Sequence, residues 1–223
     1  MNFSSKDSPE RVVCYVDGFN LYFGLHDERL RRYYWLNVRS LAENLLRPNQ
    51  ALVQTKYFTA RISGAMSDDP PQRAARLNAK RKRQSDFLEA LETVEDLSIY
   101  EGHYLAKSAR CRNCGASWRS HEEKMTDVNI ATEMLIDALH DRLDTALLVS
   151  ADSDLVPPVR ALIRNFPGKR VVVAFPLGRN SGRLRQAASA WLTIGRKKYK
   201  MSQFPDQVVK ADGHVLQRPS DWR

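Results

Sequence analysis

The stretch VCYVDGFNLY, residues 13–22, joins an unbroken apolar run to a carboxylate. Such a run of β-branched and aromatic residues is typical of a strand that is buried on both faces. The run stops at Asp17, and a glycine, an aromatic residue and Asn20 follow. Two interpretations are open here. Asp17 lies in a ligand crevice at the carboxyl end of a strand, or it caps a helix that follows.

The rest of the chain alternates strand-like and helix-like segments, which predicts an α/β fold with a mainly parallel sheet and helices on both faces. Residues 1–10 are expected to be a disordered lead, 11–200 the domain, and residues from 201 a loose tail. Strands are predicted at 11–16, 52–60, 97–105, 145–150, 169–176 and 191–195, and helices at 38–47, 71–95, 127–141, 154–166 and 182–190.

Charge and composition narrow the class of partner. The chain has 223 residues and a formal net charge of +9, which suits a polyanion, nucleic acid before an anionic membrane. A basic protein without such a partner is the alternative. No apolar run reaches the ~20 residues of a membrane span, and the start lacks the apolar core of a secretory signal. Three cysteines without that signal indicate a reducing compartment, which we take to be the cytoplasm.

Further acidic residues sit at the ends of predicted elements. Asp152 and Asp154 follow the fourth predicted strand. Asp127 is the first residue of the predicted helix at 127–141, and the other residues on its face of that helix are small and apolar. Because the carboxyl ends of parallel strands meet at one edge, we expect these acids to share a crevice with Asp17. They would repel one another unless a cation such as Mg²⁺ or Mn²⁺ offset their charge. The alternative for Asp152 and Asp154 is helix capping.

Three segments resemble the NYN domain, which belongs to the PIN-like nuclease superfamily. They are YVDGFNLYFGL at 15–25, EEKMTDVNIATEML at 122–135 and ALLVSADSDLVPPV at 146–159. They occur in the order of the family motifs, and the resemblance covers roughly residues 11–176. It implies a compact three-layer α/β/α sandwich and metal-dependent cleavage of RNA with Mg²⁺ or Mn²⁺.

The resemblance also implies roles for single residues. Asp17, Asp127 and Asp152 would be metal ligands, and Asp154 would be a fourth ligand or would orient water. The supporting residues would be Asn20, which hydrogen-bonds within the site, Ser150, which supports the metal shell, and Lys124, which contacts a phosphate. The predicted function is a metal-dependent endoribonuclease. The alternatives are a non-catalytic RNA-binding or regulatory protein with the same fold, and a phosphatase that acts on small esters.

Motifs of other phosphate enzymes are absent from the sequence. A haloacid-dehalogenase-like D-x-D motif would need an acid where Phe19 stands. The sequence contains no P-loop motif and no Rossmann glycine motif after its first strand. It also lacks an H-E-x-x-H pair, which argues against a zinc protease.

Two basic segments are candidate RNA contacts with salt-sensitive, sequence-independent affinity. One lies in the predicted helix at 71–95, and the other follows the fifth strand and is better placed beside the acids. Solvated surfaces without a ligand are the alternative. The candidate residues are Arg73, Arg76, Lys80 and Arg83 in the first segment, and Arg179, Arg183 and Arg185 in the second.

Residues 106–123 are expected to form an irregular insertion that carries the motif CRNC. Cys111 and Cys114, followed by a glycine, form one half of a structural zinc site. His103 and His121 flank the pair, so a tetrahedral Cys₂His₂ zinc site is one hypothesis, and a disulfide or two free thiols are the alternatives. The sequence does not determine the oligomeric state, and a homodimer that extends the basic groove is compatible with it.

Overall fold

A computed structural model describes residues 8–62, 64–65 and 69–223, with the backbone alone over 104–110 and 117–123. Its main sheet has seven strands in the order β4-β3-β2-β1-β5-β6-β7. Neighbouring strands are parallel, except that β3 and β4 are antiparallel. The strands are β1 (Glu10–Asp17), β2 (Gln50–Ala60), β3 (Leu97–Arg110), β4 (Ser117–Lys124), β5 (Thr145–Val149), β6 (Arg170–Phe175) and β7 (Ala190–Thr193), with β8 (Gln207–Val209) and β9 (Val215–Gln217) in a separate two-stranded sheet.

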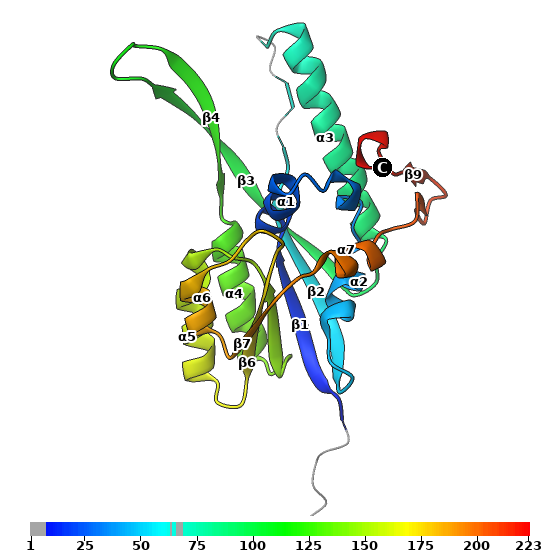
Figure 1. Ribbon diagram of the computed structural model, residues 1–223, viewed down its shortest axis with the longest axis vertical. Coiled ribbons are helices and arrows are strands. Elements are labelled where there is room, and N and C mark those ends of the chain that lie inside the picture. Colours follow the sequence, from blue (N-terminus) through cyan, green and yellow to red (C-terminus); the bar gives the residue numbers. More distant parts are fainter. Residues whose placement is uncertain (1–7, 63, 66–68) are drawn as a thin grey trace, which may run out of the picture.

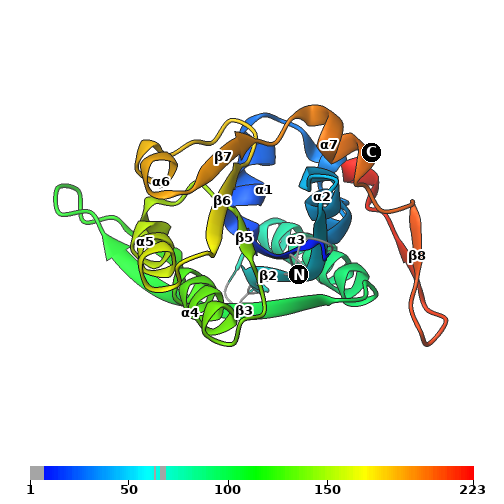
Figure 2. The same ribbon diagram turned by 90° about the horizontal axis from the view of Figure 1, so that it is seen from below.

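Helices cover both faces of the main sheet (Figures 1 and 2), so the predicted α/β/α arrangement is confirmed. Within the described part of the chain, no helix is long and apolar enough to cross a membrane. One face carries α1 (Gly18–Asp27), α2 (Val38–Leu45), α3 (Pro71–Glu92) and α7 (Arg196–Met201), the other carries α4 (Thr126–Leu139), α5 (Val156–Asn165) and α6 (Gly182–Ala187), and short 3₁₀ turns lie at η1 (Arg31–Tyr33), η2 (Ser153–Leu155) and η3 (Ser220–Trp222).

The order of strands reverses at β1. The chain builds β2, β3 and β4 on one side of β1 and then returns to build β5, β6 and β7 on the other side. Val16 pairs with Val149 in the parallel register of β1 and β5, so the next residues, Asp17 and Ser150, are neighbours at the carboxyl edge. Ligand crevices of open α/β sheets lie at such a switch point.

Alternation along β1 determines the face on which Asp17 lies. Cys14 and Val16 belong to the core under α1–α3, whereas Val13 and Tyr15 belong to the core under α4–α6. The strand is thus buried on both faces, as its apolar sequence predicts. Because successive side chains point to opposite faces, Asp17 lies on the face of Tyr15, which α4 and α5 cover.

The expectation of an irregular insertion at 106–123 is wrong, because these residues form most of a β-hairpin. β3 and β4 pair from His103–Lys124 to Arg110–Ser117, and the turn at 111–116 carries both cysteines. The hairpin projects from the body of the molecule (Figure 1). Its strands lack the apolar alternation that marks a half-buried strand, so periodicity did not predict them.

The expected loose tail also differs from the structure. β8 and β9 form an antiparallel pair, in which Val208 and Leu216 are buried in the core that contains α2 and α3. Trp222 packs against Trp35, with 6.2 Å between the ring centroids. A few apolar residues at wide spacing anchor this segment, so it shows no periodicity in the sequence. At the other terminus, most of the expected lead lies outside the described residues, and Glu10 already belongs to β1.

A buried charged cluster joins α4 to the sheet. The Nζ atom of Lys56 lies 2.6 Å from Asp137 Oδ2 and 2.7 Å from Glu133 Oε2. The hydroxyl groups of Tyr15 and Tyr100 donate to Asp137 and Glu133, at 2.6 and 2.9 Å. Burial opposes the charge of Lys56, but its hydrogen bonds to the two carboxylates outweigh burial and raise its pKa. The buried face of α4 therefore includes Asp137, where the sequence predicted only small and apolar residues.

We expect Leu216→Ala to lower the free energy of unfolding by about 2 kcal/mol or more, because it removes a buried side chain and leaves a cavity. Chemical denaturation of the full chain measures this change. Val215→Ala is the matched control in the same strand, since Val215 is 41% exposed, and it should change stability little. Equal and negligible effects of both changes would contradict a packed C-terminal segment.

Asp137→Ala should lower the free energy of unfolding by about 3–5 kcal/mol, because it leaves Lys56 buried with one of its two carboxylate partners removed. Denaturant titration measures the loss. The double variant Lys56→Met with Asp137→Leu replaces the ion pair by apolar groups and should recover part of that stability. A double variant that is no more stable than Asp137→Ala would show that the charge of Lys56 does not cause the loss.

Candidate functional site

Asp17 is the centre of a hydrogen-bond network at the switch point. Its side chain is buried, and its Oδ1 atom accepts the backbone N–H of Asn20 at 3.0 Å. Its Oδ2 atom accepts the Asn20 side-chain amide at 2.7 Å and the Ser150 hydroxyl at 2.8 Å. Asp17 thus caps α1, as one interpretation predicts, and also joins the ends of β1 and β5, whereas its place in a ligand crevice stays a prediction.

The same network continues into the acidic loop after β5. The backbone N–H of Ala151 donates to Asn20 Oδ1 at 3.3 Å, and that of Asp152 donates to Ser150 Oγ at 3.0 Å. Asp152 Oδ1 in turn accepts the backbone N–H of Asp154 at 2.9 Å, which caps η2. Asp152 therefore acts as a helix cap, as one alternative predicts. The side chain of Asp154 is exposed.

Gly18 explains why a glycine follows the acid. A Cβ atom at this position would lie 2.6 Å from the Tyr57 hydroxyl and 2.7 Å from the Phe58 carbonyl oxygen of β2. Only a residue without a side chain lets the backbone turn this close to the neighbouring strand. Gly18 thus allows α1 to begin directly after Asp17, where its first turn supplies donors to the carboxylate.

Burial, hydrogen bonds and the neighbouring Asp152 together determine the pKa of Asp17. Burial raises the pKa of Asp17, the hydrogen bonds from Asn20 and Ser150 oppose this rise, and the negative charge of Asp152 adds to it. A buried carboxyl group with a raised pKa beside a second acid is a candidate functional site. A carboxylate has about four acceptor positions, and three at Asp17 are occupied, which leaves one on Oδ1. This set of oxygen donors fits Mg²⁺ or Mn²⁺, which takes one or two carboxylates together with waters and phosphates.

Asp127 lies half-buried in the first turn of α4, which packs against η2. The start of α4 lies beside Gly102, the last residue of β3 that pairs with β2, where a Cβ atom would be 3.1 Å from Thr126 Oγ1. Within the described part of the chain, no three His, Cys, Asp or Glu side chains are grouped to hold a metal. The structure brings Asp17 and Asp152 close enough for their charges to interact, and the ligand roles of all four acids, Asp127 and Asp154 included, stay predictions.

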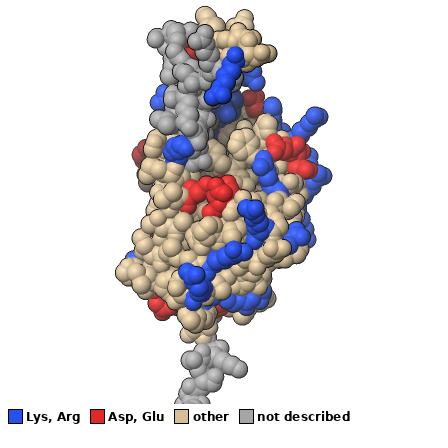
Figure 3. Space-filling model, turned by 90° about the vertical axis from the view of Figure 1, so that its left-hand side faces the viewer, with Lys and Arg blue, Asp and Glu red and all other residues tan. Residues whose placement is uncertain are grey.

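Basic side chains accompany the acids on the face of α4–α6. Figure 3 shows a compact group of acidic side chains on this side of the molecule, with lysine and arginine side chains around it. α6 packs against η2 and carries Arg183 and Arg185, which are exposed. The Arg185 guanidinium lies 4.0 Å from the centre of the Trp191 ring. Trp191 is 47% exposed and was missed by the sequence analysis, although an aromatic residue so close to a basic segment is a usable signal.

Other predicted RNA contacts are partly neutralised. Arg179 forms an ion pair with Asp27 at 2.6 Å and lies over the ring of Phe23. Arg83 forms an ion pair with Asp221 at 3.1 Å. The other predicted contacts on α3, Arg73, Arg76 and Lys80, are exposed, as predicted, and Arg73 pairs with Asp69. Lys124, in contrast, is half-buried at the base of the hairpin.

The predicted Cys₂His₂ zinc site does not fit the hairpin. His103 pairs with Lys124 at its base, seven residues before Arg110, which is about 23 Å along a strand. The backbone of His121 pairs with Ala106, and its side chain lies outside the described residues. The histidines and the cysteine turn therefore lie at different heights on the ladder, whereas a tetrahedral site needs its ligands within ~2.3 Å of one ion.

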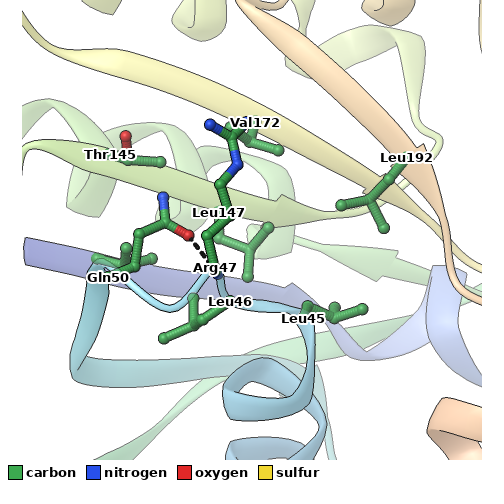
Figure 4. A pocket seen from close by; sticks show the side chains of 9 residues that line it. Leu45, Leu46, Arg47, Gln50, Thr145, Leu147, Val172 and Leu192 are labelled. Carbon is green, nitrogen blue, oxygen red and sulfur yellow. Dashed lines mark hydrogen bonds between the residues drawn. The ribbon is translucent and has the colours of Figure 1, made fainter. Parts of the chain in front are cut away.

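A separate pocket lies at the opposite edge of the sheet. Val12 and Thr145, which are register partners near the amino ends of β1 and β5, line it together with Leu147 (Figure 4). The backbone N–H of Arg47 donates to Gln50 Oε1 at its rim, at 2.9 Å. Because β1 runs five residues from Val12 to Asp17, this pocket is not part of the carboxyl-edge site.

Comparisons with known proteins agree with this architecture. The NYN domain model matches residues 11–195. A 6-hydroxy-3-succinoylpyridine 3-monooxygenase, HspA, from Pseudomonas putida is 27% identical over 211 aligned residues, which cover 80% of this chain and 62% of that protein. The crystal structure of a protein of unknown function from Vibrio parahaemolyticus aligns with a TM-score of 0.51 and 19% identity, over 86% of this chain and 98% of that one.

The similarity to the Vibrio protein concerns the fold alone, and the chain spans less than two thirds of the Pseudomonas protein. The family match, in contrast, extends from the second residue of β1 beyond the end of β7 and includes the whole carboxyl-edge network. The chain therefore belongs to the NYN domain family, whose fold is nuclease-like.

Proposed function

We propose that the protein is a metal-dependent endoribonuclease whose site is built around Asp17 and Asp152. The observation that carries this proposal is the buried Asp17 carboxylate, held by Ser150 across the switch point and close enough to Asp152 for the two charges to interact. Simple binding of RNA gains nothing from carboxylates beside phosphates, because like charges repel. Acids in a crevice of a basic protein are explained by a cation that both they and the substrate bind.

The residues have separate tasks in this proposal. Asp17 and Asp152 supply oxygen ligands, with Asp127 and Asp154 as the further acids of the predicted set. Asn20 and Ser150 hold the Asp17 carboxylate in place through their hydrogen bonds. A divalent cation bound there would lower the pKa of a bound water and offset negative charge on the phosphate.

Substrate contacts follow from the surroundings of the acids. Arg183 and Arg185 on α6 are exposed beside η2 and would bind phosphates of a single strand. Trp191, which is stacked with Arg185, and Phe23, which is 43% exposed on α1, offer aromatic rings for bases. Stacking and phosphate contacts tolerate different base sequences, so we infer a preference for single-stranded RNA without strong sequence selection.

A second candidate comes from the monooxygenase among the similar proteins. Its name describes a 3-monooxygenase of 6-hydroxy-3-succinoylpyridine, and that protein is 27% identical to this chain. Oxygen uptake with 6-hydroxy-3-succinoylpyridine and a supplied two-electron reductant, measured beside the RNA assay, separates the two candidates. Uptake that depends on the pyridine, without cleavage of RNA, would replace the nuclease proposal. RNA binding without cleavage or oxygen uptake would instead favour a non-catalytic RNA-binding protein.

Labelled single-stranded RNA should be cut in Mn²⁺ and left intact in EDTA. Asp17→Asn and Asp152→Asn should each reduce the cleavage rate by roughly 100-fold or more, because several kcal/mol of charge stabilisation correspond to that factor. Ser150→Ala removes a group that orients Asp17, and should cost about 10–100-fold. Gel analysis of the products over time measures these rates.

Glu95→Gln is the control for this series, since it removes one negative charge from an exposed residue before the amino end of β3. It should cleave at the wild-type rate. Cleavage that persists in both Asp17→Asn and Asp152→Asn, with each variant folded by circular dichroism, would assign the activity to another site or to a contaminant.

Replacement of both α6 arginines, Arg183→Ala with Arg185→Ala, should weaken binding of single-stranded RNA and reduce its salt dependence. Each phosphate contact contributes about 0.7 to the slope of log K against log salt, so the slope should fall by about 1.4. Fluorescence anisotropy in EDTA measures it. The control, Arg164→Ala with Arg170→Ala, removes the same charge from exposed residues toward the amino edge of the sheet. A control that lowers the slope equally would show that net charge, and not a binding surface on α6, determines affinity.

A further inference from the structure

The turn of the β3–β4 hairpin has the geometry of half a zinc site. Cys111 and Cys114 lie three positions apart in the turn at 111–116, which joins β3 to β4. Cys111 N–H donates to the carbonyl of Ala116 at 2.7 Å, and Gly115 N–H donates to that of Cys111 at 3.0 Å. Gly115 has a φ of 71°, in the left-handed region that favours glycine. These bonds close a tight turn that contains both cysteines.

Both thiols are free and accessible to a partner. Cys111 is half-buried and Cys114 is exposed, at the end of a hairpin that projects from the body of the molecule (Figure 1). A C-x₂-C pair in a reducing compartment is more often a metal ligand than a disulfide. The two residues between the cysteines leave the sulfurs on one side of a tight turn, which is how such pairs bind one ion.

The side chains that the structure describes do not complete this site by themselves. Structural zinc is almost always bound by four protein ligands, and within the described part of the chain no third His, Cys, Asp or Glu side chain joins the pair. The third cysteine, Cys14, is buried in β1. His103 lies at the base of the hairpin, and the backbone of His121 is paired four residues below Arg110, or about 13 Å along the strand.

We propose that zinc joins two copies of this chain, with Cys111 and Cys114 of each copy forming one tetrahedral Cys₄ site. Each copy contributes the same two ligands, so the site has the two-fold symmetry that most homodimers have. Two hairpin turns bury too little surface for a stable dimer without the metal. The dimer should therefore exist only while zinc is bound.

The charges around the turn are compatible with this arrangement. Zn²⁺ with four thiolates carries two net negative charges, and the four thiol protons pass to solvent when the metal binds. Arg112 lies between the two cysteines and is exposed in each copy, so two cations lie close to the site. They offset the charge of the zinc centre and reduce the repulsion that two basic proteins would otherwise feel.

The test uses the full chain in a reducing buffer that contains zinc, followed by removal of free metal. Elemental analysis should find one zinc ion for every two chains, and light scattering should give twice the mass of one chain. A zinc chelator should convert the dimer to monomer, and added Zn²⁺ should restore the dimer. Co²⁺ in place of zinc should give the intense visible absorption of a tetrahedral thiolate site.

Variants separate this site from other arrangements. Cys111→Ala and Cys114→Ala should each lose the zinc and the dimer while they retain the circular dichroism of the fold, whereas His103→Ala and His121→Ala should keep both. A monomer with one zinc ion per chain, a monomer without zinc, or a dimer that survives chelation would each overturn the proposal. These readouts do not involve RNA cleavage, so they test the zinc site independently of the proposed nuclease activity.

Discussion

The parallel register of β1 and β5 is the constraint on which the site depends. It makes Asp17 and Ser150 neighbours at the point where the strand order reverses, although 133 positions separate them in the chain. Backbone pairing of Val16 with Val149 defines this placement, and the Ser150 hydroxyl then donates to the carboxylate. A shift of one residue would turn Asp17 to the opposite face, away from α4 and η2. The apolar character of both strands thus determines which polar groups meet at the edge.

Below this edge, a second polar group determines where α4 lies. The carboxylate of Asp137 accepts from Tyr15, two residues before Asp17, and pairs with Lys56 on the neighbouring strand. Such a buried cluster is costly unless every member is paired, so α4 has little freedom to slide along the sheet. Because Asp127 opens the same helix, the cluster also limits where that acid can lie relative to the strand ends.

Much of the architecture could be predicted from the sequence, because apolar strands and periodic helices record burial directly. β1 and α4 were recognisable in this way, and so was the position of Asp17 at a strand end. The hairpin and the C-terminal segment were not, because the ladder of the hairpin needs no apolar pattern, and Leu216 and Trp222 are isolated anchors. The members of the network at Asp17 were predicted, but not that Asp17 would cap a helix and bind Ser150 at the same time. It does both because the two hydrogen bonds use different oxygens of one carboxylate. The prediction of His103 and His121 as zinc ligands was wrong because closeness in sequence does not show how far apart two residues lie along a β-hairpin.

The hairpin and the first turn of α4 meet at one short junction. β4 ends at Lys124, α4 begins at Thr126, and Met125 between them has a φ of 79°. A non-glycine residue in this region is strained by roughly 1–2 kcal/mol, so the surrounding structure must hold it there. One contact that does so is close packing at Gly102, where a Cβ atom would lie 2.4 Å from the Lys124 carbonyl oxygen. A hairpin held at its far end by a second copy would therefore be coupled, through a stiff and strained turn, to the first residues of α4 and to Asp127.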